Sequence, residues 1–522
     1  MIKQNFRILL FTLIVAMMPF WSSCTDDLST TPIDDSEITS DVVYDSPENF
    51  RKVLAKLYAG FATTGQEGPA GNADIQGIDE GFSSYIRQYW VHQQIPTDET
   101  VVGWADPGLP EFNEQDWGAG NDFVMGMYSR IFYQITLANE FIRNARGEDD
   151  PQIQQYLAEA RFLRALSYWH ALDFYGGGVP FVTEEDPIGA FEPEPVGNQD
   201  LFEYIESELL AIEDAMPAPQ DNQYGRADRA AVWTTLAKLY LNAETYIGDS
   251  RWDEAVTFSN RVIQEGGYNL HHNYEHLFLA DNQQADGVIF AIPFDGNNTQ
   301  TFGGTNFLIH AAIGGEMTAS DFGVDGGWGG HRATPQFVDI FGEDTPDGRA
   351  MFFTEGQIKE VEDITDFSNG YAITKWKNIT STGEPGSRSA YVDTDFPMFR
   401  LADVYLIYAE ATLRGGAGGD VNTAVNLINQ LRERAYGDDS ANISSNDLDL
   451  NFILDERARE LYWEGQRRTD LIRFNKFTTA DYVWAWKGGV QDGASTSDHL
   501  RVFPIPTSDI NANPNLTQNP GY

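Results

Sequence analysis

Cysteine is almost absent from this chain, which has only Cys24 among its 522 residues. A single cysteine cannot form an internal disulfide, so oxidative cross-links are excluded as a source of stability. Small residues precede Cys24 in the sequence WSSC. This pattern resembles a bacterial lipobox, in which the cysteine is lipidated and becomes the mature N-terminus. A cysteine used nowhere else in the chain favours that interpretation.

Long hydrophobic runs are also missing after the N-terminus. The N-terminal run from Ile8 to Phe20 has 13 residues, which is too few for a membrane span but fits the apolar core of a signal peptide. We therefore predict a lipoprotein signal peptide over residues 1–23 and a flexible acidic tether over residues 24–40. A single domain is predicted over residues 41–522. The alternative is an ordinary secretory signal with an incidental cysteine.

Basic residues are scarce relative to acidic ones. The chain has 34 Lys and Arg against 79 Asp and Glu, which gives a formal net charge of −45. Such a chain repels phosphate backbones, so nucleic-acid binding is disfavoured. Sulfated and uronic-acid sugars are disfavoured for the same reason, and a neutral ligand fits the charge better.

Catalytic motifs are missing as well, because the chain has no P-loop, no G-x-S-x-G and no H-E-x-x-H. No feature singles out a carboxylate pair with the spacing of a glycosidase. In HHNYEH, His272 and His276 lie four residues apart and Glu275 offers a third zinc ligand, but a surface cluster is the simpler interpretation. Asp281 and Asp286 offer oxygen ligands suited to calcium, with a polar turn as the alternative.

Paired amphipathic helices are the clearest positive feature. The segment Trp233 to Tyr240, WTTLAKLY, follows the first-helix signature of a tetratricopeptide repeat, with Ala237 at the position where a small residue lets the partner helix pack closely. Its predicted partner spans residues 252–266. We predict a mainly α fold in which tetratricopeptide-like helix pairs form a scaffold over residues 120–266 and 398–475. The other predicted helices span residues 153–176, 201–216, 401–416, 421–437 and 452–474.

Two segments rich in Gly, Asp, Asn and Pro interrupt the helical pattern, over residues 60–120 and 267–397. We predict that they form loops and short strands that carry the ligand site. Trp104 in PTDETVVGWADPGLP and Trp328 in VDGGWGGHR lie in these segments, where little core packing is available locally. Exposed rings stack on the flat faces of sugars, and polar side chains bind the hydroxyls. The pattern therefore predicts a surface that binds neutral glycans.

Several longer motifs follow one another in an order that resembles the SusD/RagB family. They are AEARFLRALSYWHALDFYGGGVPF, YGRADRAAVWTTLAKLYLNAETY, DTDFPMFRLADVYLIYAEA, ERARELYWEGQRRTDLIRF and VFPIPTSDINANPNLTQNPGY. The resemblance covers nearly the whole mature chain. It implies a lipid-anchored outer-membrane protein on the cell surface of Bacteroidetes that is not an enzyme. Such a protein captures oligosaccharides and passes them to a SusC-like TonB-dependent transporter for polysaccharide utilisation.

The likeness extends to the family's starch-binding founding member through DIQGIDEGFSSYIRQYW, IPTDETVVGWADPGLP and TFGGTNFL. It implies that the ligand is an α-glucan, such as starch or a maltooligosaccharide. The implied glycan-binding residues are Arg87 and the rings of Trp104, Phe302 and Trp328. Asp106 is added to them, as a substitute for the hydrogen-bonding asparagine expected at the next position. No cofactor is implied, apart from calcium at the acidic turn described above.

Two positions of the same loop depart from the starch-binding pattern. Val102 replaces another aromatic residue, and Pro107 falls where an asparagine would bind a hydroxyl. Several alternatives therefore stay open. The same fold could carry another neutral polysaccharide or a peptide, the chain could be a surface glycoside hydrolase, or the repeats could serve an adaptor that binds proteins.

Overall fold

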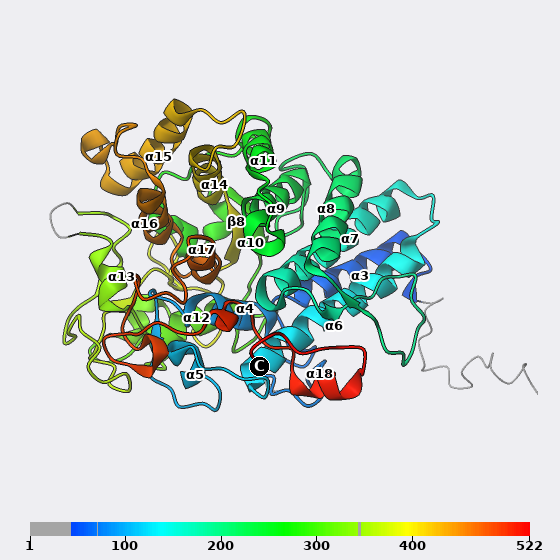
Figure 1. Ribbon diagram of the computed structural model, residues 1–522, viewed down its shortest axis with the longest axis horizontal. Coiled ribbons are helices and arrows are strands. Elements are labelled where there is room, and N and C mark those ends of the chain that lie inside the picture. Colours follow the sequence, from blue (N-terminus) through cyan, green and yellow to red (C-terminus); the bar gives the residue numbers. More distant parts are fainter. Residues whose placement is uncertain (1–42, 70, 343–345) are drawn as a thin grey trace, which may run out of the picture. The chain divides into compact units, whose positions relative to one another are not determined.

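The computed structural model describes residues 43–69, 71–342 and 346–522, and the chain divides into two units between Asn49 and Phe50. Helices predominate in the larger unit, and its strands form two-stranded sheets (Figure 1). The predicted mainly helical fold class is therefore confirmed. Within the described ranges, no helix has both the length and the apolar character needed to cross a bilayer. The predicted signal peptide, Cys24 and the tether lie outside the described residues.

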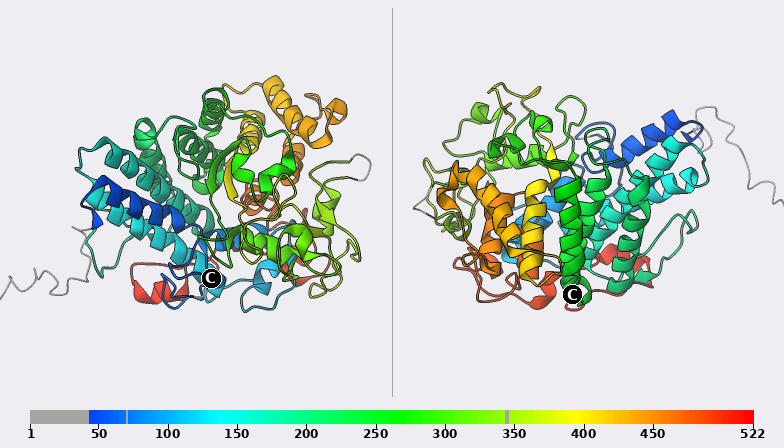
Figure 2. Two further views of the ribbon diagram at one scale, coloured as in Figure 1. Left: turned by 180° about the vertical axis from the view of Figure 1, so that it is seen from behind. Right: turned by 90° about the horizontal axis from the view of Figure 1, so that it is seen from above.

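The predicted helix pairs are present and lie side by side (Figures 1 and 2). Helix α9 (Arg229–Leu241) packs against α11 (Trp252–Glu265), and α14 (Leu401–Leu413) packs against both α11 and α15 (Val421–Tyr436). The small positions Ala237, Ala409 and Ala424 are fully buried, as close helix packing requires. The remaining helices of this scaffold are α3 (Pro47–Ala59), α6 (Asp122–Ala145), α7 (Pro151–Tyr175), α8 (Asn198–Ile212) and α10 (Ala243–Ile247).

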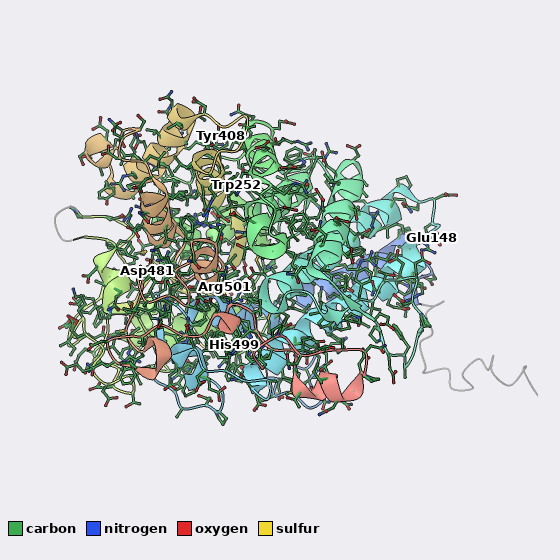
Figure 3. All side chains as sticks on the ribbon, viewed as in Figure 1. Glu148, Trp252, Tyr408, Asp481, His499 and Arg501 are labelled. Atoms are coloured by element: carbon green, nitrogen blue, oxygen red, sulfur yellow. The ribbon has the colours of Figure 1, made fainter. Side chains whose placement is uncertain are left out.

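Polar side chains fix where the scaffold helices begin. The carboxylate of Asp228 accepts a hydrogen bond from the backbone N–H of Ala231 at the start of α9, and Asp420 accepts one from Thr423 at the start of α15. Tyr408 on α14, which Figure 3 labels, reinforces the second cap. Its hydroxyl accepts from the backbone N–H of Asp420 at 3.0 Å. Local capping and helix packing therefore act together here.

The helix predicted over residues 452–474 is wrong in one respect, because the structure contains two helices there. Helix α16 (Leu450–Leu461) ends before Trp463, and α17 (Arg467–Arg473) begins after Gly465. Trp463 has a φ of 61° and Gly465 a φ of 78°, and both values leave the helical region. The break lets the backbone N–H of Trp463 donate to Glu99 at 3.0 Å. A tertiary contact has overridden the local pattern.

Short antiparallel strands tie the irregular segments together, as the sequence predicts. Strand β1 (Val101–Val102) pairs with β5 (His331–Arg332), and β4 (Val288–Ile292) pairs with β8 (Phe396–Arg400) in an irregular register. The other pairs are β2 (Val179–Pro180) with β3 (Pro195–Val196) and β6 (Phe352–Phe353) with β7 (Ala372–Ile373). The first pairing places two distant loops next to each other.

The two segments predicted as irregular also contain helices. Helix α4 (Tyr85–Gln94) lies in the first segment and α12 (Gly304–Ala312) in the second, and these two helices contact each other. Every residue of α12 is buried, and so is every residue of α4 except Arg87. The prediction of low helix content there is therefore wrong at these positions. The shorter helices are α5 (Pro110–Glu114), α13 (Pro335–Asp339) and α18 (Thr507–Ala512).

Candidate functional site

The loops that carry the two predicted tryptophans are held together by the β1–β5 pairing. Val101 faces Arg332 and Val102 faces His331 across this short ladder. Directly beyond it, the backbone N–H of Gly103 donates to the carbonyl of Gly330 at 3.1 Å. The pairing therefore places the loop that follows β1 alongside the loop that precedes β5.

Trp104 and Trp328 are in contact within this arrangement. The indole Nε1–H of Trp104 donates to the backbone carbonyl of Trp328 at 3.1 Å, and the two ring centroids are 6.4 Å apart. On its inner side the Trp104 ring lies 5.3 Å from the ring of His331 and 6.1 Å from that of Phe307. The predicted exposed ring is thus half-buried, with one part supported by the core and the other part accessible.

Trp328 lies flat on a buried histidine. Its ring is nearly parallel to that of His310, with a centroid distance of 5.0 Å and an interplanar angle of 17°. Its backbone N–H donates to the carbonyl of His310 at 2.7 Å. Burial lowers the pKa of His310, so the imidazole is neutral at pH 7, and its Nδ1 donates to the carbonyl of Gly326 at 2.7 Å. The half-buried Trp328 ring is therefore fixed in orientation.

Arg87 projects from α4 into the same region. Its Nη1 donates to the carbonyls of Gly81 at 2.8 Å and Phe302 at 3.1 Å, and its guanidinium lies 4.2 Å from the centroid of the Phe307 ring. Burial lowers the pKa of Arg87 to about 10, while the nearby charges of Asp106 and Asp79 act in the opposite direction. Its Nη2 and its buried Nε have no hydrogen bond to another described residue, so Nη2 remains available to donate to a ligand.

Phe302 lies two residues before α12, and its carbonyl accepts a hydrogen bond from Arg87. Its half-buried ring lies 6.1 Å from the ring of Tyr391, a residue that the sequence analysis missed. An aromatic residue in the polar stretch SRSAYVDTD is the signal that could have pointed to Tyr391. Phe302 and Tyr391 come from chain segments 89 positions apart, and only the fold shows that they are neighbours.

The other predicted positions of the first loop divide between surface and core. Asp106 is exposed, and it influences the site through its charge on Arg87. Asp79 contributes a similar charge and was also missed, although it lies in the motif DIQGIDEGFSSYIRQYW. Val102 is 2% exposed, and its backbone N–H and carbonyl both bond to the side chain of Asn113. Val102 is therefore a core anchor, and Pro107 is exposed.

The arrangement suits a ligand with flat apolar faces and hydroxyl groups. The guanidinium of Arg87 and the ring of Trp104 both lie near the ring of Phe307. Trp104 also donates to the carbonyl of Trp328, and the carbonyl of Phe302 accepts from Arg87. Rings stack on apolar faces, and guanidinium and carboxylate groups bind hydroxyls. The structure thus brings all five predicted residues to one region built from α4, the loop after β1, the residues before α12 and the loop before β5.

The histidine cluster differs from its prediction. His271, not His272, lies next to His276, with 3.4 Å between Nε2 of the former and Nδ1 of the latter. His276 belongs to a short 3₁₀ turn over Tyr274–Phe278. Glu275, the predicted third ligand, is paired with Lys377 at 2.6 Å. In the described ranges, no group of three or more His, Cys, Asp or Glu is placed to hold a metal ion.

The acidic turn with Asp281 and Asp286 serves a structural contact. The two carboxylate oxygens of Asp281 accept hydrogen bonds from the backbone N–H and the hydroxyl of Ser381, at 2.8 and 2.7 Å. The backbone N–H of Asp286 donates to His271 at 3.1 Å. The carboxylate of Asp281 is therefore directed at another loop, and calcium binding at this turn stays a prediction.

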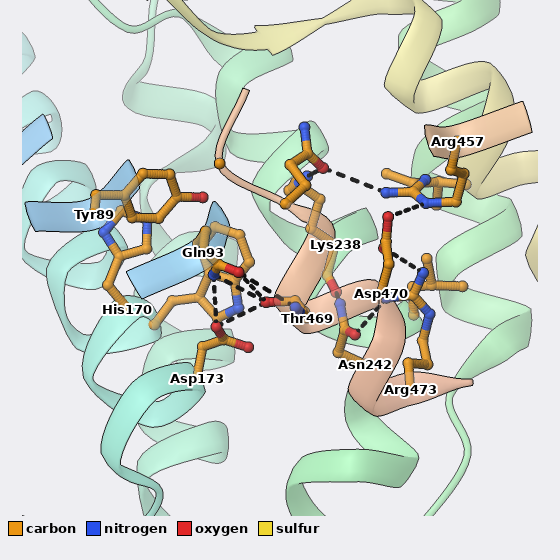
Figure 4. Close-up of a pocket in the computed structure, with 15 residues that line it drawn as sticks. Tyr89, Gln93, His170, Asp173, Lys238, Asn242, Arg457, Thr469, Asp470 and Arg473 are labelled. Carbon is orange, nitrogen blue, oxygen red and sulfur yellow. Dashed lines mark hydrogen bonds and ion pairs between the residues drawn. The ribbon is translucent and has the colours of Figure 1, made fainter. Parts of the chain in front are cut away.

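A polar cavity between α4, α7, α9 and α17 is too small for a sugar (Figure 4). Its volume is about 20 Å³, which has room for about one water molecule. Lys238 in its wall is bonded to Asp403 at 2.5 Å, and Gln93 bonds to Asp173 at 2.9 Å. Burial lowers the pKa of Lys238, while Lys238 and Arg457 hold the pKa of buried Asp403 at about 2. The residues that line this cavity are part of the buried ion-pair network of the core.

Comparison with known proteins gives a consistent result. Residues 353–522 match the model of the SusD family. The chain is 35% identical to the starch-binding protein SusD of Bacteroides thetaiotaomicron, over 100% of this chain and 99% of that protein. It is 25% identical to a SusD-like protein of Bacteroides ovatus, over 70% and 68% of the two chains.

Solved structures share the fold at low sequence identity. A SusD superfamily protein from Parabacteroides distasonis is similar with a TM-score of 0.71 and 22% identity, over 93% of this chain and 100% of that one. Surface glycan-binding protein A from Bacteroides thetaiotaomicron, in complex with laminarihexaose, is similar with a TM-score of 0.70 and 20% identity, over 90% and 99%.

Proposed function

The chain belongs to the SusD family, and from this premise we propose that it captures α-glucan, such as starch or maltooligosaccharides, at the cell surface. SusD-family glycan-binding proteins are non-catalytic, so the prediction that this protein is not an enzyme is confirmed and the hydrolase alternative is set aside. In the proposal, lipid on Cys24 holds the protein at the outer membrane. A SusC-like TonB-dependent transporter then receives the glycan.

One observation carries the α-glucan proposal: Arg87, Trp104, Phe302 and Trp328 come from separate segments and meet in one region. In the proposed complex, the rings stack on successive glucose units of a curved chain, and Arg87 with Asp106 binds hydroxyls. The 35% identical relative is named as a starch-binding protein, which supports the same ligand. The alternative is another neutral polysaccharide, favoured by Val102, which is buried and offers no ring.

Isothermal titration of the mature chain with maltoheptaose, laminarin and xylan tests the proposal. We expect heat of binding with maltoheptaose, and we expect Trp104→Ala and Trp328→Ala each to lower its affinity about tenfold or more. Phe191→Ala is the matched control, because Phe191 is a surface ring in another loop, 38% exposed. Binding of laminarin or xylan without maltoheptaose would assign the site to another neutral glycan.

A further inference from the structure

A tight turn over residues 223–226 forms a ridge between two hollows that none of the predicted glycan-binding residues lines. One hollow, of about 240 Å³, lies between this ridge and residues 267–269 and 283–291. The other, of about 440 Å³, lies between the ridge, α3 and residues 292–299. Tyr224 belongs to the walls of both hollows.

The ring of Tyr224 is both accessible and fixed. Tyr224 is 43% exposed, yet its hydroxyl donates to the buried carboxylate of Asp395 at 2.8 Å. Next to it, Gly225 has a φ of 79°, and a Cβ there would lie 2.4 Å from the ring of Pro293. Arg226 holds the other end of the ridge by pairing with Glu159. A ring that is already immobile loses little conformational entropy when a ligand stacks on it.

Unpaired amides line the smaller hollow beside this ring. The side chains of Gln223, Asn269 and Gln283 are exposed, and within the described residues none of them makes a side-chain hydrogen bond. Each amide carries two donors and one acceptor, which complements hydroxyl groups that both donate and accept. Three such amides beside one fixed aromatic ring provide the hydrogen-bonding groups and the stacking surface that bind a neutral sugar.

The charged groups of the smaller hollow do not favour an ionic ligand. Asp228 accepts from the backbone N–H of Gln220 at 2.6 Å and from the hydroxyl of Tyr268 at 2.8 Å, so its carboxylate is engaged. Arg226 is engaged by Glu159. The exposed carboxylate of Asp286 adds an acceptor for hydroxyls and repels anions.

We propose that this ridge is a second carbohydrate-binding site, at which a sugar unit of a neutral polysaccharide stacks on Tyr224. Hydroxyls of the sugar bond to Gln223, Asn269 and Gln283. The inference rests on the proposed glycan-binding function, but it uses none of the residues of the first site. Because a polysaccharide repeats the same unit, two sites on one protein strengthen retention of a long chain.

Retardation in native gels that contain amylopectin, laminarin or xylan tests this site with the glycan that the wild type binds. We expect Tyr224→Ala to weaken retardation about 3- to 10-fold, both in the wild type and in the Trp104→Ala background. Tyr224→Phe keeps the ring but loses the hydrogen bond to Asp395 that fixes it, so it is expected to bind more weakly than the wild type and more tightly than Tyr224→Ala. Phe191→Ala controls for loss of an exposed ring elsewhere.

The outcomes separate the two proposals. If the wild type is not retarded by any glycan, the proposed function itself is wrong. The second site alone is overturned if the wild type is retarded and Tyr224→Ala changes nothing. In that case the single variant is retarded as strongly as the wild type, and the double variant as strongly as Trp104→Ala. Should Tyr224→Ala lower the melting temperature, the double variant Gln223→Ala with Gln283→Ala replaces it. That variant removes two exposed amides, is expected to weaken retardation, and overturns the second site if it does not.

Discussion

At the scale of single residues, the candidate site depends on positions that lack a side chain. A Cβ on Gly330 would lie 2.4 Å from the Trp104 indole, and one on Gly327 would lie 2.1 Å from the carbonyl of Ile313. Both distances are well inside van der Waals contact. Gly330 lets the Trp104 ring pack against the loop before β5, and Gly327 lets that loop pack against the residue after α12, so the two glycines determine where the rings lie.

Gly330→Ala is expected to displace the Trp104 ring and to break its hydrogen bond to Trp328. The overpacking should destabilise the protein by about 1–3 kcal/mol and lower glycan affinity. Urea unfolding, tryptophan fluorescence and titration with maltoheptaose measure these effects. Gly326→Ala is the control, because a Cβ there meets no atom within 4 Å. Equal stability and fluorescence of the two variants would contradict the prediction.

The rings of the site could be predicted only in part from the sequence. Trp104 and Trp328 stand out because each lies in a Gly-rich loop with little local packing. Tyr391 was missed because its proximity to Phe302 depends on how distant segments fold together. The support that Trp104 receives from His331 is a tertiary contact of the same kind. Residue type indicates which side chains can bind a sugar, whereas the fold determines which distant residues become neighbours.

At the scale of elements, the long scaffold helices were predictable, and two short helices inside the irregular segments were not. Helices α11 and α15 have an apolar face and a polar face, which produce the 3.6-residue period that the sequence analysis used. Helix α9 is buried at every residue except Arg229 and was predicted from its repeat motif. Helix α12 has no polar face toward solvent, since all of its residues are buried, and α4 is nearly the same. They are also short, with 10 residues in α4 and 9 in α12, and each lies between loops rich in Gly, so no long helical pattern marks them in the sequence. These two helices position Phe302 and Arg87. The helices that support the site most directly were therefore the ones that the sequence did not predict.

The break between α16 and α17 leads to a prediction at this scale. Gly465→Ala is expected to destabilise the protein, because its φ of 78° is unfavourable for alanine and its Cβ would lie 2.3 Å from the ring of Tyr89. Gly437→Ala has a similar φ of 81° and open space around the new Cβ, so it isolates the backbone effect. Urea unfolding should show Gly465→Ala to be less stable than Gly437→Ala by about 1–3 kcal/mol. Equal losses would show that the contact with Tyr89 adds nothing.

At the scale of the whole molecule, several of the few cations are buried inside the fold. Arg349, Arg400 and Arg467 are buried and paired with the carboxylates of Glu456, Glu464 and Asp98, respectively. Charges of both signs are therefore removed from the surface in pairs, and the excess of acidic residues remains outside. An acidic exterior repels anionic polymers, which agrees with a neutral glycan as ligand.

Buried histidines make the stability of the whole molecule depend on pH. His92 on α4 is fully buried against Phe112 and Phe503, and burial lowers its pKa to about 3. In the unfolded chain a histidine has a pKa of about 6.5, so the unfolded state binds more protons between these two values. Stability from neutral His92 is therefore present above about pH 6.5 and is lost as the pH falls toward 3.

The test compares urea unfolding of the wild type and His92→Gln at pH 7 and pH 5. Between these two values, the wild type should lose about 2 kcal/mol more than His92→Gln, because only the wild type has a histidine at position 92 that takes up a proton on unfolding. All other titrating groups are shared by the two proteins, so the difference between their losses isolates His92. His272→Gln, at an exposed position, should behave like the wild type. Parallel losses in the wild type and His92→Gln would mean that His92 is not held neutral by burial.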